Sequence, residues 1–244
     1  MVSTVLPPPQ TILQRFALLL DVDGTLLDIA PTPESVIVPP ELPTTLRRLH
    51  RALGGALAII SGRPLDQIDR LFGNAFPAAA EHGAVLRVPP AAARRLALPD
   101  VPAAWRDAAE TLARQHPGVR IEAKTLGFVV HYRGAPEAGP MLEHALDALL
   151  RPEEKFEVMP ADMALEVRPR GADKGTAVAA VMAAPAFAGR LPLFIGDDVT
   201  DLDGIRATEA LGGIGLRVHE AFGSPASVRA WLGALRELHD APAS

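Results

Sequence analysis

The most informative hydrophobic pattern in the chain is an apolar run at residues 16–20 that ends directly in two acidic residues, a glycine and a threonine. An apolar run of this length, closed by a turn signal, predicts a strand buried on both faces within a parallel sheet. Asp21 and Asp23 would then lie at the carboxyl end of the strand, where open α/β sheets bind their ligands. The simpler alternative is a strand that ends in an acidic turn, because Asp-Gly pairs are common turn formers.

Apolar runs continue to alternate with helical patterns after this strand, which is typical of a parallel α/β sheet. Leucines recur at helical spacing over residues 42–53, and Pro64 suits the first turn of the next helix. The other strands expected in this sheet are 56–60, the alanine run before Glu81, 191–195 and 211–218, and further helices are expected after Lys174 and after Ser224-Pro225. Residues 1–14 are expected to form a loose arm.

The pattern changes between Val88-Pro89-Pro90 and about Arg170. Helical and alternating segments there follow the order helix, strand, strand, helix, strand, strand, which predicts a smaller α+β (αββαββ) domain inserted into the larger one. The expected division is residues 1–90 with 171–244 for the α/β core domain and 91–170 for the inserted domain. The chain of 244 residues is long enough for this arrangement.

Composition narrows the classes of protein and of partner. No cysteine is present, which excludes disulfides and thiolate chemistry. The net charge of -5, without a basic cluster, and the aromatic content of 5% argue against a nucleic-acid partner. No apolar segment could span a bilayer and no signal pattern opens the chain, so we expect a cytoplasmic protein without a membrane partner.

Polar residues suited to phosphoryl transfer follow three of the predicted strands: the pair Asp21/Asp23, Ser61, and the pair Asp197/Asp198. A parallel sheet gathers its strand ends at one edge, so these residues are expected to converge. Clustered carboxylates repel one another unless a hard cation lies between them, and Mg²⁺ prefers oxygen ligands. The sequence therefore predicts a phosphotransferase site with Mg²⁺ held by Asp21, Asp23 and Asp197.

Each candidate residue has a role in this chemistry. Asp21 is expected to attack phosphorus and form an aspartyl-phosphate, and Asp23 to protonate the leaving oxygen and later activate water. Ser61 and its backbone N–H would bind the phosphate, as would Thr25 in the first loop, and Lys174 would neutralise charge beside the nucleophile. Taken singly, these residues also have structural interpretations: Ser61 as a helix cap and Lys174 as a solvated residue. Asp201 is expected to cap the helix after Thr200 or to support the site from behind.

Four stretches of the chain, in order, resemble the motifs of the haloacid dehalogenase (HAD) superfamily of phosphotransferases. These are Asp21-x-Asp23-Gly-Thr25, Ser61-Gly-Arg63, Lys174-Gly175 and Gly196-Asp197-Asp198. The resemblance implies a Rossmann-like three-layer core with a parallel sheet. It also implies that the inserted domain is a cap that determines substrate specificity.

Additional stretches resemble the trehalose-6-phosphate phosphatase family within that superfamily. They are Glu81-His82-Gly83, Glu122-x-Lys124, His131-Tyr132-Arg133, Glu166-Val-Arg168-Pro169 and Gly196-Asp-Asp-x-Thr200-Asp201. The family implies a phosphoric monoester hydrolase of trehalose biosynthesis that uses Mg²⁺ to convert trehalose 6-phosphate to trehalose and phosphate. One departure is Leu202, which stands where the family usually has Glu.

The resemblance also implies which residues bind the sugar phosphate. They are Glu122, Lys124 and Glu166 in the cap, with Thr25, Gly62, Arg63, His82 and Gly83 in the core loops. Strand alternation agrees, because it places Glu122 with Lys124, and Glu166 with Arg168, on faces opposite the apolar residues. The alternative is an ordinary solvated sheet face with salt bridges.

Other functions stay open at this point. A HAD phosphatase of sucrose phosphate or glucosylglycerate phosphate is the nearest alternative, and a phosphomutase, which would need an activating bisphosphate, is more distant. A catalytically silent module that binds sugar phosphate or a synthase would have no use for the nucleophile Asp21. Association with a trehalose-phosphate synthase is a possible partnership for the enzyme itself.

Overall fold

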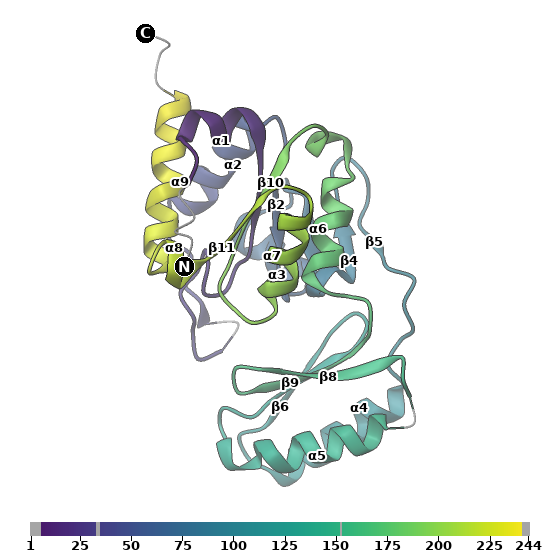
Figure 1. The fold of residues 1–244 in the computed structure, drawn as a ribbon. Helices are drawn as coiled ribbons and strands as arrows, with labels where there is room; N and C mark the ends of the chain where they lie inside the picture. The colour runs from purple at the N-terminus through teal and green to yellow at the C-terminus, as the bar shows by residue number, and fades with distance from the viewer. Residues whose placement is uncertain (1–5, 33–34, 152, 241–244) are drawn as a thin grey trace. The chain divides into compact units, whose positions relative to one another are not determined.

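The computed structural model describes residues 6–32, 35–151 and 153–240, and these form two compact units (Figure 1). The first unit holds the described residues up to Arg95 and from Asp173 onward, and the second holds Leu96–Ala172. The first boundary lies later than residue 90 because β5 (Arg94–Arg95) pairs with β4 (Val85–Arg87) of the first unit. Periodicity could not reveal this two-residue strand.

The first unit is built on a seven-stranded sheet in the order β11-β10-β1-β2-β3-β4-β5. Its other strands are β1 (Phe16–Leu20), β2 (Leu57–Ile60), β3 (Ala78–Ala80), β10 (Leu191–Gly196) and β11 (Ile214–Arg217). These five pair in parallel, and β4 and β5 add antiparallel at one edge. Every residue of β1 is buried, as its apolar run predicts for a strand with neighbours on both sides.

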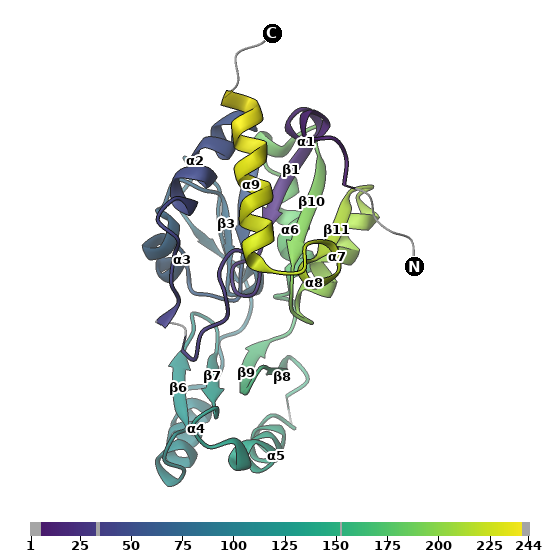
Figure 2. The same ribbon diagram turned by 90° about the vertical axis from the view of Figure 1, so that its left-hand side faces the viewer.

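Helices cover both faces of this sheet and confirm the predicted three-layer α/β core. They are α1 (Pro9–Arg15), α2 (Leu42–Ala52), α3 (Leu65–Phe72), α6 (Lys174–Met182), α7 (Asp201–Ala210), α8 (Val218–Ala221) and α9 (Pro225–Asp240). Figures 1 and 2 show α1, α2 and α9 packed together on one face and α6 with α7 on the other. In the described parts of the chain, no helix is long and apolar enough to cross a membrane.

The expectation of a loose arm over residues 1–14 is wrong for its described part. Pro9–Arg15 form α1, whose Ile12 is completely buried, and α1 packs against α9. A helix this short is not stable by itself, so its formation depends on tertiary packing. Residues 1–5 lie outside the described part of the chain.

The second unit is a four-stranded antiparallel sheet with two helices, in the predicted αββαββ order. Its elements are α4 (Ala103–Gln115), β6 (Arg120–Ala123), β7 (Phe128–His131), α5 (Gly139–Leu150), β8 (Phe156–Ala161) and β9 (Ala164–Pro169), with sheet order β6-β7-β9-β8. Phe128 and Val130 of β7 pack with Leu142 and Leu146 of α5 in a core separate from that of the first unit. One apolar face of the sheet is thus covered by helices, which leaves the other face to polar residues.

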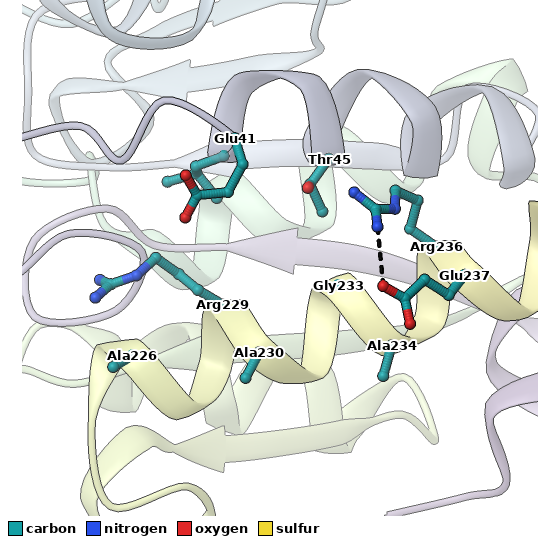
Figure 3. A pocket seen from close by; sticks show the side chains of 10 residues that line it. Glu41, Thr45, Ala226, Arg229, Ala230, Gly233, Ala234, Arg236 and Glu237 are labelled. Atoms are coloured by element: carbon teal, nitrogen blue, oxygen red, sulfur yellow. Dashed lines mark hydrogen bonds and ion pairs between the residues drawn. The ribbon is translucent and has the colours of Figure 1, made fainter.

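A hollow of about 530 Å³ lies between α2 and α9 of the first unit (Figure 3). Small side chains of α9, including Ala230 and Gly233, line it together with Thr45 of α2. Arg229, also on its wall, donates to the Leu26 carbonyl at 3.0 Å and pairs with Asp28 at 3.1 Å. Arg229 therefore ties the C-terminal helix to the segment that follows β1.

Candidate active site

The sheet brings the predicted strand ends together. Leu20 of β1 lies beside Ile195 of β10, and the Asp21 N–H donates to the Ile195 carbonyl at 3.0 Å, so Asp21 and Asp197 leave adjacent strands. Gly24 allows the first loop to approach closely, since a Cβ at this residue (φ +75°) would lie 2.6 Å from Asp197 Oδ2. β2 lies on the other side of β1, which places Ser61 at the same sheet edge.

Lys174 lies between two carboxylates in the interior of this site. Its Nζ is 2.7 Å from Asp21 Oδ1 and 2.6 Å from Asp201 Oδ1, and all three residues are at most 4% exposed. The side chain emerges from the first turn of α6, which Asp173 starts through a capping box with Thr176. Lys174 is thus a fixed buried cation, and its interpretation as a solvated helix residue is wrong.

Asp201 joins Lys174 to the loop after β10, which is a larger role than capping a helix. Its Oδ2 accepts hydrogen bonds from the N–H groups of Asp197 at 3.0 Å and Asp198 at 2.9 Å, while Oδ1 faces Lys174. The side chain bonds back to the loop after β10 instead of capping α7. The spacing in the sequence is compatible with this contact, because Asp side chains often accept from backbone N–H groups a few residues away.

The pKa values of this buried cluster are strongly shifted. Burial, reinforced by the Asp201 carboxylate, raises the pKa of Asp21 to about 7 although Lys174 opposes the shift. Burial by itself would lower the pKa of Lys174, but the two carboxylates outweigh it and raise that pKa above its usual range. The cluster therefore carries an excess of negative charge that a divalent cation beside Asp21 would neutralise.

The first loop supplies two further groups. Thr25 Oγ1 donates to Asp21 Oδ2 at 3.1 Å, which leaves Asp21 oriented by hydrogen bonds on both oxygens. The Asp23 carboxylate forms a bidentate ion pair with Arg63, in which Nε and Nη2 each lie 2.7 Å from one of its oxygens. Arg63, which was expected to bind the sugar, is thus paired with Asp23, the expected proton carrier.

The loop Ser61-Gly62-Arg63 is held from the side by the segment after β3. The His82 N–H donates to the Ser61 carbonyl at 3.0 Å and the Glu81 N–H to the Arg63 carbonyl at 3.1 Å. Glu81 (φ 48°) and His82 (φ 55°) are left-handed, a conformation that costs about 1–3 kcal/mol per residue and that clusters at functional sites. The segment therefore stores strain against the predicted phosphate loop.

Gly62 and Gly83 serve this close packing. A Cβ on Gly62 would lie 2.6 Å from the His82 ring, and one on Gly83 would meet Ala177 of α6 at 3.0 Å. The Ser61 Oγ accepts from the Arg63 N–H at 3.2 Å, whereas the N-cap of α3 is Pro64. The interpretation of Ser61 as a helix cap is therefore wrong.

A divalent cation fits part of the predicted ligand set. Among the residues that the structure describes, no three His, Cys, Asp or Glu side chains are grouped as a metal site, and Arg63 occupies the Asp23 carboxylate. The carboxylates of Asp21 and Asp197 remain, and Mg²⁺ is commonly held by one or two carboxylates with water and phosphate. Asp197 also has a neighbour that sequence reasoning missed: His219 of α8, whose Nδ1 is 3.6 Å from Asp197 Oδ1.

In the second unit, the predicted polar face is present. Glu122, Val129 and Glu166 are paired across β6, β7 and β9, so Glu122 and Glu166 share the face opposite the buried core. Glu122 is 2.8 Å from both Lys124 Nζ and His131 Nε2. These ion pairs agree with the alternative of an ordinary sheet face with salt bridges, and they do not conflict with sugar binding.

We expect the Glu122 cluster to make the stability of the protein depend on pH. Burial opposes ionisation, but His131 and Lys124 lower the pKa of Glu122 from 4.5 to about 2. The cluster therefore stabilises the fold above pH 4.5, and this stabilisation is lost as the pH falls toward 2. Glu122→Gln should lower the free energy of unfolding by roughly 2 kcal/mol at pH 7, and the deficit should shrink below pH 4.5.

Urea unfolding of the full chain between pH 7 and pH 3 measures this difference. Glu143→Gln, on an exposed position of α5, is the matched control and should change little at any pH. A deficit for Glu122→Gln that is the same at pH 7 and pH 3 would contradict the assignment of the effect to the ionised carboxylate.

The fold is that of HAD-type hydrolases. A solved haloacid dehalogenase-like hydrolase from Bacteroides thetaiotaomicron has a TM-score of 0.62 at 14% identity, with 92% of this chain and all (100%) of that one covered. The solved C-terminal domain of the C. albicans trehalose-6-phosphate phosphatase has a TM-score of 0.76 at 23% identity, with 94% and 96% covered.

Sequence comparison identifies the family. The family model described as trehalose-phosphatase matches residues 19–226, and the chain belongs to this family. It is 42% identical over 238 residues to a probable trehalose-phosphate phosphatase of Sinorhizobium fredii, covering 93% of this chain and 89% of that protein. It is 36% identical over 221 residues to the trehalose-6-phosphate phosphatase of Escherichia coli, covering 89% and 81%. A bifunctional trehalose-6-phosphate synthase/phosphatase of Thermoproteus tenax is 33% identical over 198 residues, which are 77% of this chain and 26% of that protein.

Proposed function

We propose that this protein hydrolyses trehalose 6-phosphate to trehalose and phosphate. The observation that carries the proposal is the buried Asp21, oriented by Lys174 and Thr25 at the end of β1 beside the Asp197 loop. A fixed carboxylate next to a buried cation suits nucleophilic attack on phosphorus. Membership of the trehalose-phosphatase family supports the sugar phosphate as the substrate.

The proposed reaction has two displacements at phosphorus. An Asp21 oxygen attacks phosphorus, the bond from phosphorus to the sugar oxygen breaks, and Asp23 gives its proton to that oxygen. Asp23 then takes a proton from water, the water oxygen attacks the aspartyl-phosphate, and phosphate leaves with Asp21 restored. The Ser61 hydroxyl and neighbouring N–H groups, with Gly62 giving access, bind the phosphate oxygens throughout.

Mg²⁺ is the proposed metal, held by the carboxylates of Asp21 and Asp197. The Asp23 carboxylate is paired with Arg63, so its oxygens are left out of the proposed ligand set. When bound, the ion neutralises charge on the transferring phosphoryl group. Burial raises the pKa of the Asp21 carboxyl. A nearby cation would lower this pKa again and so favour the ionised form that attacks phosphorus.

Mg²⁺-dependent phosphate release from trehalose 6-phosphate is the direct test. We expect release with Mg²⁺, loss by more than about 100-fold with a chelator, and recovery when Mg²⁺ is added back. A panel with sucrose 6-phosphate, glucosylglycerate phosphate and glucose 6-phosphate should show the highest kcat/KM for trehalose 6-phosphate. Activity that resists the chelator would refute the metal proposal. A higher kcat/KM for another sugar phosphate of the panel would refute trehalose 6-phosphate as the preferred substrate.

We propose that the polar face of the second unit recognises the sugar. Glu166 is 9% exposed and Glu122 is held by Lys124 and His131, so these carboxylates are fixed acceptors for hydroxyl groups. Glu122→Ala or Glu166→Ala should lower kcat/KM for trehalose 6-phosphate by roughly 10–100-fold and that for p-nitrophenyl phosphate by less than about threefold.

The matched control is Glu143→Ala, which removes an exposed carboxylate from the helical layer of the same unit. This variant should leave both substrates unaffected. Equal losses on the two substrates in the Glu122 and Glu166 variants would count against a sugar-recognition role for this face.

Association with a trehalose-phosphate synthase is the proposed partnership. The bifunctional name of the Thermoproteus tenax relative supports it, because that protein joins both activities in one chain. Sedimentation of the purified chain mixed with a synthase from the same source should show a shared boundary. Independent sedimentation at micromolar concentrations would refute it.

A further inference from the structure

We propose that Arg63 is a positioning residue for the proton carrier Asp23, and not a ligand of the sugar. The proposal rests on the proposed phosphatase function. Its basis is the bidentate pair, in which Nε and Nη2 of Arg63 each lie 2.7 Å from a different oxygen of Asp23. Two parallel charge-assisted bonds of this kind fix the plane of the carboxylate as well as its distance.

Arg63 is the rigid member of this pair. Its side chain is 8% exposed, whereas that of Asp23 is 42% exposed. The third guanidinium nitrogen, Nη1, donates to Gln67 Oε1 of α3 at 3.1 Å, and the main chain of Arg63 is bonded to Ser61 and Glu81 on either side. A buried, multiply anchored arginine thus holds a partly exposed carboxylate in a single orientation.

The same geometry predicts how Arg63 affects the chemistry. When Asp23 gives its proton to the leaving oxygen, its O–H bond breaks as the new O–H bond of the alcohol forms, and a carboxylate remains. The bidentate pair aims the carboxyl group of Asp23, so the contribution of Arg63 should grow with the need of the leaving group for a proton. A sugar or other alcohol needs that proton, whereas p-nitrophenolate leaves without it.

Two substrates that lack a sugar separate positioning from sugar binding. For Arg63→Met we expect kcat/KM, which reports steps up to release of the alcohol, to fall about 30-fold with glycerol 2-phosphate and by less than about threefold with p-nitrophenyl phosphate. Gln67→Ala removes the anchor that Gln67 gives to Arg63. It should also lower kcat/KM more for glycerol 2-phosphate than for p-nitrophenyl phosphate, but by a smaller factor. This second variant keeps the test available should Arg63→Met fold poorly.

A double-mutant cycle supplies the decisive measurement. If Arg63 acts through Asp23, Arg63→Met should cause less than a twofold further loss in an Asp23→Asn background, because interacting residues are not additive. Arg87→Met is the matched control, since Arg87 is also buried and pairs with Asp69 at 2.7 Å. It should change the kcat/KM values of both esters equally, whatever its effect on stability.

Three outcomes would overturn the inference. The first two are equal losses with the alkyl and aryl esters and a full effect of Arg63→Met in the Asp23→Asn background. The third, a loss confined to trehalose 6-phosphate, would instead assign Arg63 to the sugar. Each of these results requires an active wild-type enzyme. Failure of the wild type to release phosphate from any ester would reject the proposed function and is therefore distinguishable.

Discussion

Replacing Asp21 with asparagine is expected to abolish phosphate release, by roughly 10⁴-fold or more, while the protein stays folded. An amide cannot supply the attacking carboxylate oxygen, although it has nearly the same shape. Its single oxygen can still accept from Lys174, while its NH2 group can donate to the Thr25 hydroxyl. Phosphate release from trehalose 6-phosphate, together with thermal unfolding of the same sample, measures both parts of the prediction.

The fold should tolerate this change because the ionised form of Asp21 is destabilised in the native site. Burial and the Asp201 carboxylate raise the pKa of Asp21 from 3.8 to about 7. A carboxyl whose folded pKa is raised favours the folded state at low pH, and this advantage is lost as the pH rises from 3.8 through 7. At pH 8, in the absence of metal, Asp21→Asn should therefore unfold at a temperature no lower than the wild type.

Asp28→Asn is the matched control for this experiment. Asp28 follows the same strand, is more exposed than Asp21, and pairs with Arg229. It should keep nearly full activity. If folded Asp21→Asn retained more than about 1% of wild-type activity, Asp21 would not be the nucleophile.

Replacing Lys174 with methionine is expected to lower the free energy of unfolding by about 3–5 kcal/mol at pH 8. The stem of the side chain is kept, but the cation that pairs with both Asp21 and Asp201 is removed. These two residues are then buried carboxylates that repel each other. Turnover should also fall by more than about 10³-fold, because the nucleophile loses its orienting donor. Urea unfolding and phosphate release are the measurements.

A second substitution distinguishes the electrostatic reason from poor packing. Lys174→Met combined with Asp201→Asn removes one of the two repelling charges and should recover part of the lost stability, but not the activity. Lys155→Met, at an exposed position, is the control and should be close to wild type. A Lys174→Met protein as stable as the wild type at pH 8 would contradict the description of this cluster.

The hydrophobic pattern by itself predicted most of the architecture. The run at residues 16–20 is a fully buried parallel strand, and the αββαββ order of the second unit agrees with its periodicity. Local patterns succeed in these regions because burial on one or both faces of an element acts on residues two, three or four positions apart. The same patterns failed for α1 and β5, which are too short to show a period. These elements depend on tertiary contacts, α1 with β1 and α9, and β5 with β4.

Motifs at the ends of predicted strands indicated the residues of the candidate site, but how these residues pair depends on the folded arrangement of the strands. Lys174 meets Asp21 across 153 positions, and Arg63 meets Asp23 across 40. Side-chain pairs at this separation depend on the order and register of the strands, which periodicity along the chain does not contain. For this reason the sequence determined which groups are available at the sheet edge, whereas the fold decided that Asp201 joins Lys174 to the Asp197 loop and that Arg63 holds Asp23.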